Sequence, residues 1–309
     1  MGNPKERTLP AIATVNCFQQ PGQWFRANFH THTTLSDGDT GLAERCRQYR
    51  DEGYHVLAIT DHEKTNDTNG LSDDGFLVIS GMETHPPDPS GGLYHLVCLN
   101  VPHGFSLADV DDPNERIRRV REAGGEAIIA HPYWCGHTLA DLLPLEGAVA
   151  MEVYNATCSK IGKAFSNVHW DDLLAAGRIL PAVAVDDVHR GRDIFMGWTW
   201  LKMPDLTVES VLQALRTGCF YSSCGPEIHD FQVSDGVARL RCSPAREVHF
   251  IGRNSSGRSF YADGGEPFTE IEAPVKYGMR YVRCEVVDAA GNRAWTNPVI
   301  PDEVIPPEE

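Results

Sequence analysis

The sequence predicts an α/β fold followed by a smaller all-β domain. Between about residues 25 and 204, short apolar runs alternate with segments of helical spacing, which is the pattern of an α/β protein and favours a barrel. After Gly225-Pro226, short runs are separated by Gly, Asn and Asp turn signals, as in antiparallel β structure. We therefore expect a barrel domain over residues 1–226 and a β-sandwich-like domain over residues 227–309.

The strands of the first domain are predicted from its apolar runs, several of which are continuous rather than alternating and therefore typical of buried strands. They cover residues 25–29, 56–60, 76–80, 94–101, 126–130, 148–153, 179–185 and 197–201. Four segments between them carry helix signals, at residues 40–53, 113–124, 170–177 and 207–218. In these segments Thr40 and Asp112 are candidate N-caps, Pro113 fits a first helical position, and glycine follows each end.

The second domain contains shorter runs, several of them alternating, and its strands are expected at residues 231–234, 238–242, 247–251, 258–261, 269–272 and 280–287. Its residues show no cluster of chemically reactive side chains. It could bind carbohydrate or a partner, cap the barrel or form an oligomer interface, and the sequence does not decide among these roles.

Composition narrows the class of protein. Hydrophobic residues make up 41% and charged residues 23% of the chain, which is typical of a soluble globular protein. No apolar run approaches the ~18 residues of a membrane span, and a net charge of −16 argues against nucleic acid as the main partner. The nine cysteines form no C-x-x-C pair, and the first residues lack the apolar core of a secretory signal. We therefore expect reduced thiols and a cytoplasmic location.

Candidate metal ligands stand at the predicted strand ends. In α/β barrels the C-terminal strand ends converge on one site, and residues i and i+2 of an extended H-x-H segment face the same side. Imidazole and carboxylate groups together bind Zn, Mn and Fe. The candidates number nine, enough for two or three divalent ions: His30, His32, Asp37, His62, Glu83, His95, His131, Asp187 and His189. The sixth strand leads to Glu152 and Asn155.

The motifs H-x-H-x(4)-D, T-D-H, G-x-E, a later His, A-H-P and D-x-H, in this order, resemble the PHP (polymerase and histidinol phosphatase) metal-dependent hydrolases. The resemblance covers about residues 23–225. It implies a distorted seven-stranded β/α barrel with a bi- or trinuclear centre, and phosphoester hydrolysis. Residues 206–228 and the segment RAWTNPV also resemble stand-alone PHP proteins with a C-terminal β domain, some of which look like carbamate or ester hydrolases.

The resemblance also implies how the ligands are shared. His30 and His32 would hold one ion with Glu83 and Asp187, and these four would hold the water that the ions activate for attack. Glu83 would bridge to a second ion held by His95 and His131, and the remaining ligands, Asp37, His62 and His189, would hold a third.

Cations near these motifs are candidates for binding a small anionic substrate. Arg190 and Arg192 follow D-x-H, Lys64 follows T-D-H, and Lys160 lies beyond Asn155. We expect at least one of the four to contact a phosphate.

Several side chains near these motifs allow two interpretations. Asn155 could contact substrate or form a turn, and Asp61 could orient a ligand histidine or belong to a turn. Tyr133 and Trp134 could line the pocket or pack. His85 and His137 could face the substrate or a loop, and Cys135 could be a ligand or a buried thiol.

We expect hydrolysis of a small phosphoester. One alternative is hydrolysis of a carboxylic ester, carbamate or amide at the same site, which a less cationic and more apolar pocket would favour. The other is a metal-binding regulatory module without turnover, whose ions would have no open coordination position.

Overall fold

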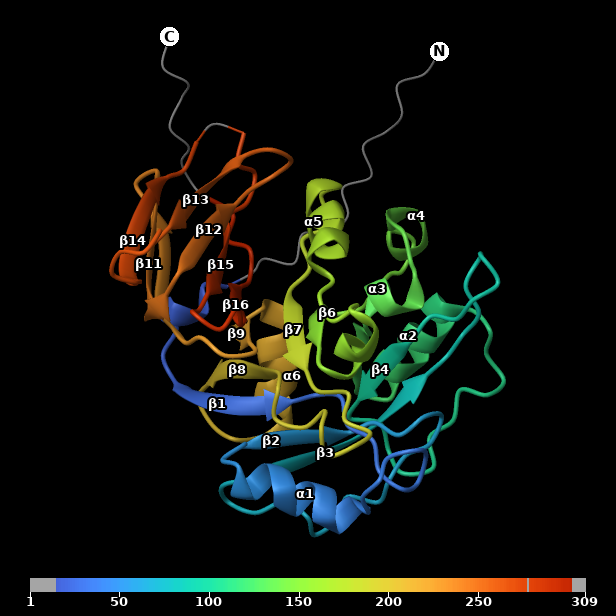
Figure 1. The fold of residues 1–309 in the computed structure, drawn as a ribbon. Coiled ribbons are helices and arrows are strands. Elements are labelled where there is room, and N and C mark those ends of the chain that lie inside the picture. Colours follow the sequence, from blue (N-terminus) through green and yellow to red (C-terminus); the bar gives the residue numbers. More distant parts are fainter. Residues whose placement is uncertain (1–14, 277, 302–309) are drawn as a thin grey trace, which may run out of the picture.

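The computed structural model describes residues 15–276 and 278–301, so the ends of the two predicted domains, residues 1–14 and 302–309, lie outside the described residues. The fold is mixed α/β with an all-β C-terminal part (Figure 1). A 13-stranded sheet has the order β13-β12-β15-β16-β9-β8-β1-β2-β3-β4-β5-β6-β7, and a three-stranded sheet has the order β10-β11-β14.

The predicted strands of the first part are confirmed, with ends shifted by a few residues. They are β1 (Gln23–Asn28), β2 (Val56–Ile59), β3 (Leu77–Thr84), β4 (Leu96–Leu99), β5 (Glu126–Ile129), β6 (Ala150–Asn155), β7 (Ala182–Val185) and β8 (Trp198–Met203). Every residue of β2, β4, β5 and β7 is buried, as continuous apolar runs predict.

All four predicted helices are present, as α1 (Leu42–Asp51), α2 (Pro113–Glu122), α5 (Asn167–Ala175) and α6 (Val208–Thr217). The Asp112 side chain caps α2 by accepting from the Glu115 amide at 2.8 Å, as predicted. The prediction of Thr40 as the cap of α1 is wrong, because Gly41 holds that position. The remaining helices are short: α3 (Pro132–Cys135), α4 (Leu139–Leu142), and the 3-10 helices η1 (Cys17–Gln19) and η2 (Thr157–Ile161).

Two strands run against their neighbours. Pairs β1–β2, β2–β3, β5–β6 and β6–β7 are parallel, whereas β4 is antiparallel to both β3 and β5, and β8 is antiparallel to β1. The reversal of β4 has a consequence for the site, because it places the start of this strand beside the ends of β3 and β5. Thr84 pairs with Leu96, and Leu96 pairs with Ile129, so His95 lies at the same edge as the residues that follow β3 and β5.

The segments after β1 and β7 meet at this edge. A parallel bridge joins Thr31 to Val188, where the Asp187 amide donates to the His30 carbonyl at 2.9 Å and the His32 amide donates to the Val188 carbonyl at 3.1 Å. The two segments that carry H-x-H and D-x-H are therefore held together by their own backbones.

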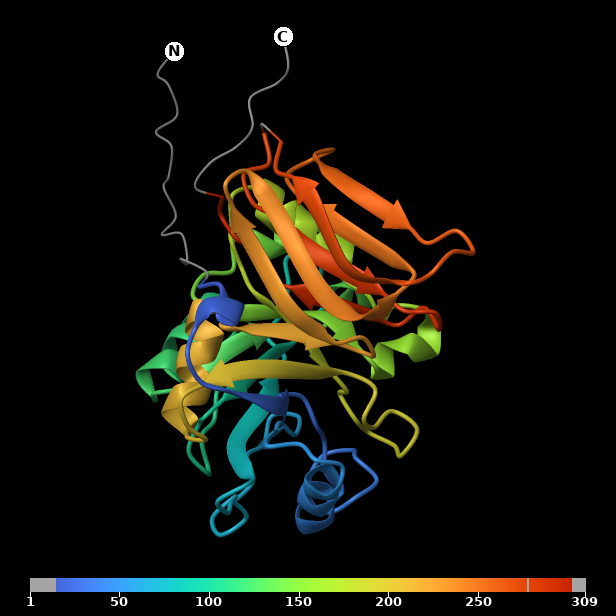
Figure 2. The same ribbon diagram turned by 90° about the vertical axis from the view of Figure 1, so that its left-hand side faces the viewer.

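The large sheet crosses the predicted domain boundary. The strands β9 (Phe220–Ser223) and β16 (Arg293–Thr296), which were not predicted, pair antiparallel and join β8 to the C-terminal strands. These strands are β10 (Ile228–Ser234), β11 (Val237–Ala245), β12 (Glu247–Ile251), β13 (Gly257–Tyr261), β14 (Phe268–Pro274) and β15 (Arg283–Val287). They share one hydrophobic core, and Figure 2 shows them stacked as layers above the first part.

A polar contact also joins the two parts. The buried Arg283 on β15 donates to both carboxylate oxygens of Asp171 on α5 at 2.8 and 2.7 Å, and its guanidinium lies 4.6 Å from the centre of the Trp170 ring. Asn167, at the start of α5, donates to Glu285 at 2.8 Å. Strand β15 therefore holds α5 through the ion pair of Arg283 with Asp171 and the hydrogen bond between Asn167 and Glu285.

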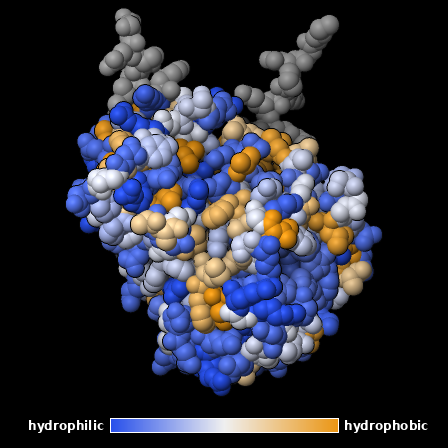
Figure 3. All heavy atoms as spheres, in the orientation of Figure 1, coloured by the Kyte–Doolittle hydropathy of each residue, from blue (hydrophilic) through white to orange (hydrophobic). Residues whose placement is uncertain are grey.

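All nine cysteines are free thiols. No helix within the described ranges is long and apolar enough to cross a membrane. On the face drawn in Figure 3, hydrophobic residues form separate small patches among hydrophilic ones.

Candidate metal centre

The structure brings all nine predicted ligands together at the edge where β1, β2, β3, β5 and β7 end and β4 begins. Five overlapping groups of three or four side chains each place one nitrogen or oxygen atom per residue within 4.8 Å of the others. Two residues outside the predicted ligand set, His85 and Glu152, also belong to these groups.

The most buried part of the centre consists of His30, His32, Glu83 and Asp187. Nε2 of His32 lies 2.9 Å from Oδ1 of Asp187, and Nε2 of His30 lies 3.3 Å from the same oxygen. Both nitrogens also approach Oε2 of Glu83, at 3.6 and 3.4 Å. None of the four side chains is more than 6% exposed, so their polar atoms converge in a volume that is largely shielded from bulk water.

Glu83 faces two groups of histidines with its two oxygens. Oε2 lies near His30 and His32, whereas Oε1 lies 2.7 Å from Nδ1 of His95 and 3.2 Å from Nε2 of His131. A carboxylate placed in this way can serve two adjacent cations.

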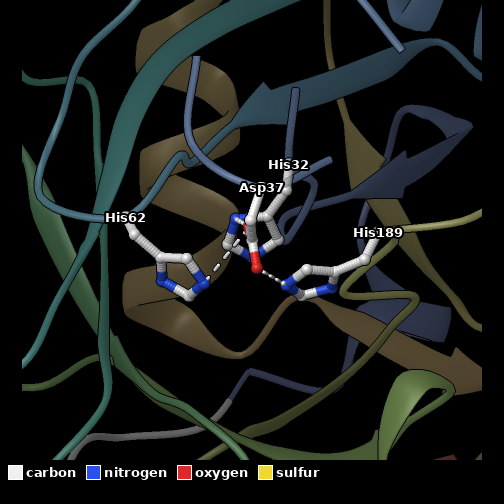
Figure 4. Close-up of side chains that lie close together, drawn as sticks. All are labelled: His32, Asp37, His62 and His189. Carbon is white, nitrogen blue, oxygen red and sulfur yellow. Dashed lines mark ion pairs between the residues drawn. The ribbon is translucent and has the colours of Figure 1, made fainter. Parts of the chain in front are cut away.

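The outer part of the centre is open to solvent. Oδ1 of Asp37 lies 3.5 Å from Nε2 of His62 and 3.9 Å from Nδ1 of His32, and Oδ2 lies 3.3 Å from Nε2 of His189 (Figure 4). The Asp37 side chain is 52% exposed and that of His62 is 30% exposed. The candidate centre therefore has a buried end and an exposed end that share His32.

The buried donor atoms fit a divalent cation. Within the described part of the chain, five of them have no hydrogen-bond partner: Nε2 of His30, Nδ1 and Nε2 of His32, Oε2 of Glu83 and Oδ1 of Asp187. They lie close together without hydrogen-bond alignment, and burying such atoms unpaired is costly. A set of imidazole nitrogens and carboxylate oxygens is the chemistry that Zn, Mn and Fe accept.

The carboxylates and imidazoles of the buried part shift one another's pKa values. Burial raises the pKa of Glu83, but His30, His95 and a hydrogen bond from His131 outweigh it and hold the pKa well below its usual range. Burial lowers the pKa of His30, yet the carboxylates of Asp187, Glu152 and Glu83 raise it well above its usual value. The carboxylates are thus kept ionised and available to a cation.

Glu152 positions two of the histidines. Its Oε1 accepts from Nδ1 of His30 at 2.6 Å, and its Oε2 accepts from the His131 backbone amide at 2.9 Å. A carboxylate that binds one imidazole nitrogen directs the other nitrogen toward a metal. The sequence places Glu152 at a strand end but gives no sign of this contact, because the residue lies more than a hundred positions from His30.

Asn155 lies behind the centre rather than in its opening. It is buried, and its amide nitrogen donates to Glu152 at 2.9 Å and to Oδ2 of Asp187 at 3.2 Å. Its Oδ1 accepts from the Cys158 amide at 3.1 Å. This placement favours positioning of Asp187 over contact with a substrate.

Asp61 organises the loop that carries Asp37. Its carboxylate accepts from the Thr33 amide at 2.8 Å and the Thr33 hydroxyl at 2.7 Å, and also binds Ser36 and Asn66. Of the two interpretations of Asp61, this placement favours the structural one, in which the residue holds the 33–36 turn.

Comparison with known proteins supports the fold. No model of a protein family and no curated protein matches the chain. A solved two-domain protein from Bacteroides vulgatus, described as containing a predicted PHP-like metal-dependent phosphoesterase, has a similar structure, with a TM-score of 0.51 and 12% identity over 90% of this chain and 96% of that one. In fold, the chain is PHP-like.

Two further solved structures are similar at lower scores. One is a candidate metal-dependent phosphoesterase from Bifidobacterium adolescentis, with a TM-score of 0.44 and 15% identity over 62% of this chain and 96% of that one. The other is an amidohydrolase from Chromobacterium violaceum with bound sulfate, with a TM-score of 0.42 and 16% identity over 63% of this chain and 96% of that one.

In the PHP-like fold of this chain, an open cavity of about 470 Å³ lies over the candidate centre. Seven predicted ligands form its floor, whereas His30 and His32 lie beneath it. The residues that line it are Asp37, His62, Glu83, His95, His131, Trp134, Thr157, Cys158, Lys160, Ile161, Asp187, His189, Arg190 and Arg192. A volume of this size suits a small molecule.

The four basic side chains predicted to bind an anionic substrate differ in how far neighbouring groups compensate their positive charge. Lys160 pairs with the buried Asp193 at 2.7 Å. Arg190 uses NH1 to donate to the Asp37 and His189 carbonyls at 2.7 and 2.9 Å, and Arg192 is exposed and lies 3.7 Å from Asp193. Lys64 donates to the Leu35 carbonyl at 2.9 Å and does not line the cavity.

The residues with two interpretations take different places around the candidate centre. Nε2 of His85 lies 3.1 Å from Nδ1 of His62, so His85 stands beside the ligands. The sulfur of Cys135 lies 3.5 Å from Nδ1 of His131. His137 is buried 3.5 Å from Asp88 and does not line the cavity. Of the adjacent aromatic residues, Trp134 lines the cavity and Tyr133 does not.

Proposed function

We propose that this chain is a metal-dependent hydrolase of small phosphoesters, with two or three divalent ions of Mn, Fe or Zn at the candidate centre. The observation that carries the proposal is the convergence of five buried, unpartnered nitrogen and oxygen atoms from His30, His32, Glu83 and Asp187 beneath an open cavity. Donor atoms grouped in this way suit divalent cations, and the cavity gives a substrate access to them.

We divide the proposed ligands among the ions as the resemblance implies, and the distances around Glu83, Asp187 and Asp37 support this division. His30, His32, Glu83 and Asp187 would hold one ion, Glu83 with His95 and His131 a second, and Asp37, His62 and His189 a third. Bound divalent ions lower the pKa of water and stabilise negative charge on the oxygens of a substrate. We also interpret the bridge between Thr31 and Val188 as the closing seam of a distorted barrel formed by β1–β7.

The protein's own side chains would orient the ligands and the substrate. Glu152 fixes the imidazole of His30, and Asn155 fixes the carboxylate of Asp187. Arg190 and Arg192 border the cavity with donors that suit phosphate oxygens. These arginines favour a phosphoester over a neutral carbonyl substrate.

A hydrolysis panel on chelator-treated protein reloaded with Mn, Fe or Zn tests the proposal. We expect metal-dependent release of p-nitrophenol from p-nitrophenyl phosphate or its bis-ester, and loss of this activity in the His32→Ala variant. His229→Ala is the matched control, because this exposed histidine lies on β10, outside the candidate centre, and pairs with Glu227.

Other results would contradict the proposal. Turnover of p-nitrophenyl acetate alone would point to a carbonyl hydrolase at the same site. Metal binding without turnover of any of the three esters would favour the regulatory module.

A further inference from the structure

The cavity over the candidate centre is lined by two large apolar side chains, Trp134 and Ile161, and by two arginines, Arg190 and Arg192. We call the first pair the apolar wall and the second pair the cationic wall. Trp134 is 43% exposed and Ile161 is 62% exposed. Two large apolar side chains from separate segments that stay exposed beside the same polar floor are a feature of ligand sites, because water is a poor partner for both.

Trp134 is held in place by the ligand histidines themselves. Its ring centre lies 5.4 Å from that of His95 and 5.2 Å from that of His131, both in edge-on arrangements. Its backbone amide donates to the His131 carbonyl at 2.9 Å, and α3 ends one residue later, before Gly136. The indole is therefore fixed beside the metal ligands before any substrate arrives.

Ile161 lies on a segment that is tied to the chain after β7. It ends η2, whose first residue, Thr157, donates to the Asp187 carbonyl at 2.7 Å. Lys160, next to Ile161, pairs with the buried Asp193 on the loop that carries the arginines. The apolar wall is therefore anchored at both of its residues.

The cationic wall keeps its charge available. The NH1 of Arg190 is held by two neutral carbonyl groups, those of Asp37 and His189, which orient the guanidinium without neutralising it. Arg192 is 3.7 Å from its nearest carboxylate, and its side chain is 72% exposed. Both can meet an anionic group that approaches the floor.

From these two walls we infer that the site selects esters in which an anionic phosphoryl group is joined to an aromatic alcohol. The phosphoryl group meets the floor and the arginines, and the aromatic ring packs against Trp134 and Ile161. The inference rests on the proposed function for the reaction, but it concerns binding, and binding can be measured without turnover.

Calorimetric titration of the manganese-loaded protein with phenylphosphonate and methylphosphonate tests the inference. The two inert probes share the anionic group and differ in the ring. We expect the wild type to bind phenylphosphonate at least ~10-fold more tightly, since a ring packed on tryptophan adds both buried area and stacking. Trp134→Ala should lose this preference while its affinity for methylphosphonate changes little.

Tyr133→Ala is the matched control, because Tyr133 is the adjacent aromatic residue of α3, is also exposed, and does not line the cavity. It should keep the full preference, and Trp134→Phe, which retains a ring, should keep part of it. Equal affinities in the wild type, no binding of either probe, or a preference that survives Trp134→Ala would overturn the inference. A clear preference in a protein that hydrolyses no phosphoester would support the inference and contradict the proposed function instead.

Discussion

Oε1 of Glu152 accepts a hydrogen bond from Nδ1 of His30 at 2.6 Å, with both side chains fully enclosed. This contact leaves Nε2 of His30 directed at Glu83 and Asp187, where it has no hydrogen-bond partner within the described part of the chain. The hydrogen bond thus fixes both the tautomer and the orientation of a candidate ligand.

Replacing Glu152 with Gln should weaken metal binding. The amide cannot provide the negative charge that favours the Nδ1-protonated imidazole, and we expect a ~10–100-fold loss of manganese affinity. Calorimetric titration of the chelator-treated variant measures it. Glu209→Gln, at an exposed carboxylate on α6, is the control, and an unchanged affinity in Glu152→Gln would show that the contact does not orient a ligand.

The exposed end of the centre should release its ion first. The group of His32, Asp37, His62 and His189 contains the most exposed side chains of the candidate ligands, whereas the group of His30, His32 and Asp187 is largely shielded from solvent. Stepwise addition of a chelator to the loaded protein should remove one equivalent rapidly and the rest slowly. In Asp37→Ala the rapid phase of metal release should disappear. A single phase of release from the wild type would refute the distinction between an exposed and a buried end of the centre.

Stability should depend on the contact between Arg283 and Asp171. Arg283 is buried, but Asp171 is 35% exposed and Glu285 also lies 3.6 Å from Arg283, so Asp171→Ala should lower the free energy of unfolding by ~1–3 kcal/mol. Urea denaturation measures this change. The matched control is Glu272→Ala, which removes the carboxylate of the exposed pair with Arg239 and should cost less than ~1 kcal/mol. Equal effects of the two substitutions would mean that the buried pair does not hold α5 against β15.

Acidification should lower the free energy of unfolding partly through protonation of Glu63. Burial raises the pKa of this carboxyl, but hydrogen bonds from His85 and the charge of Arg116 outweigh it and lower the pKa from 4.5 to about 2. A lowered pKa stabilises the folded state above pH 4.5, and this contribution is lost as the pH falls from 4.5 to about 2.

We therefore expect Glu63→Gln to be less stable than the wild type by about 1 kcal/mol at pH 7, after allowance for solvent screening of a partly exposed group. The difference should shrink between pH 4.5 and 2 in urea denaturation of metal-free protein. Glu270→Gln, at an exposed position of β14, should show no such trend. A difference that grows on acidification would contradict the assignment.

The sequence predicts much of the fold and the candidate ligands because both depend on local patterns. Continuous apolar runs mark β2, β5 and β7, and the residues that follow them, His62, His131 and Asp187, are the ones that the structure brings together. The order of the motifs also leads to the PHP-like fold, which the Bacteroides vulgatus structure shares.

What the sequence does not reveal depends on long-range pairing. The reversal of β4 has no local signal, because strand direction is set by the neighbours, here β3 and β5. The strands β9 and β16 have four residues each and are stabilised by pairing with β8 and β15 and with each other, although β9 and β16 lie far apart in the sequence. Glu152 likewise has no local signal, because its role depends on a hydrogen bond with His30, 122 positions away in the sequence.

The most direct test of the metal centre is the manganese content of the protein after loading and removal of free ions. The account predicts at least two equivalents per chain in the wild type, and fewer in Glu83→Gln, because Glu83 faces two groups of histidines with its two oxygens. Less than one equivalent in the wild type, or an undiminished content in Glu83→Gln, would contradict it.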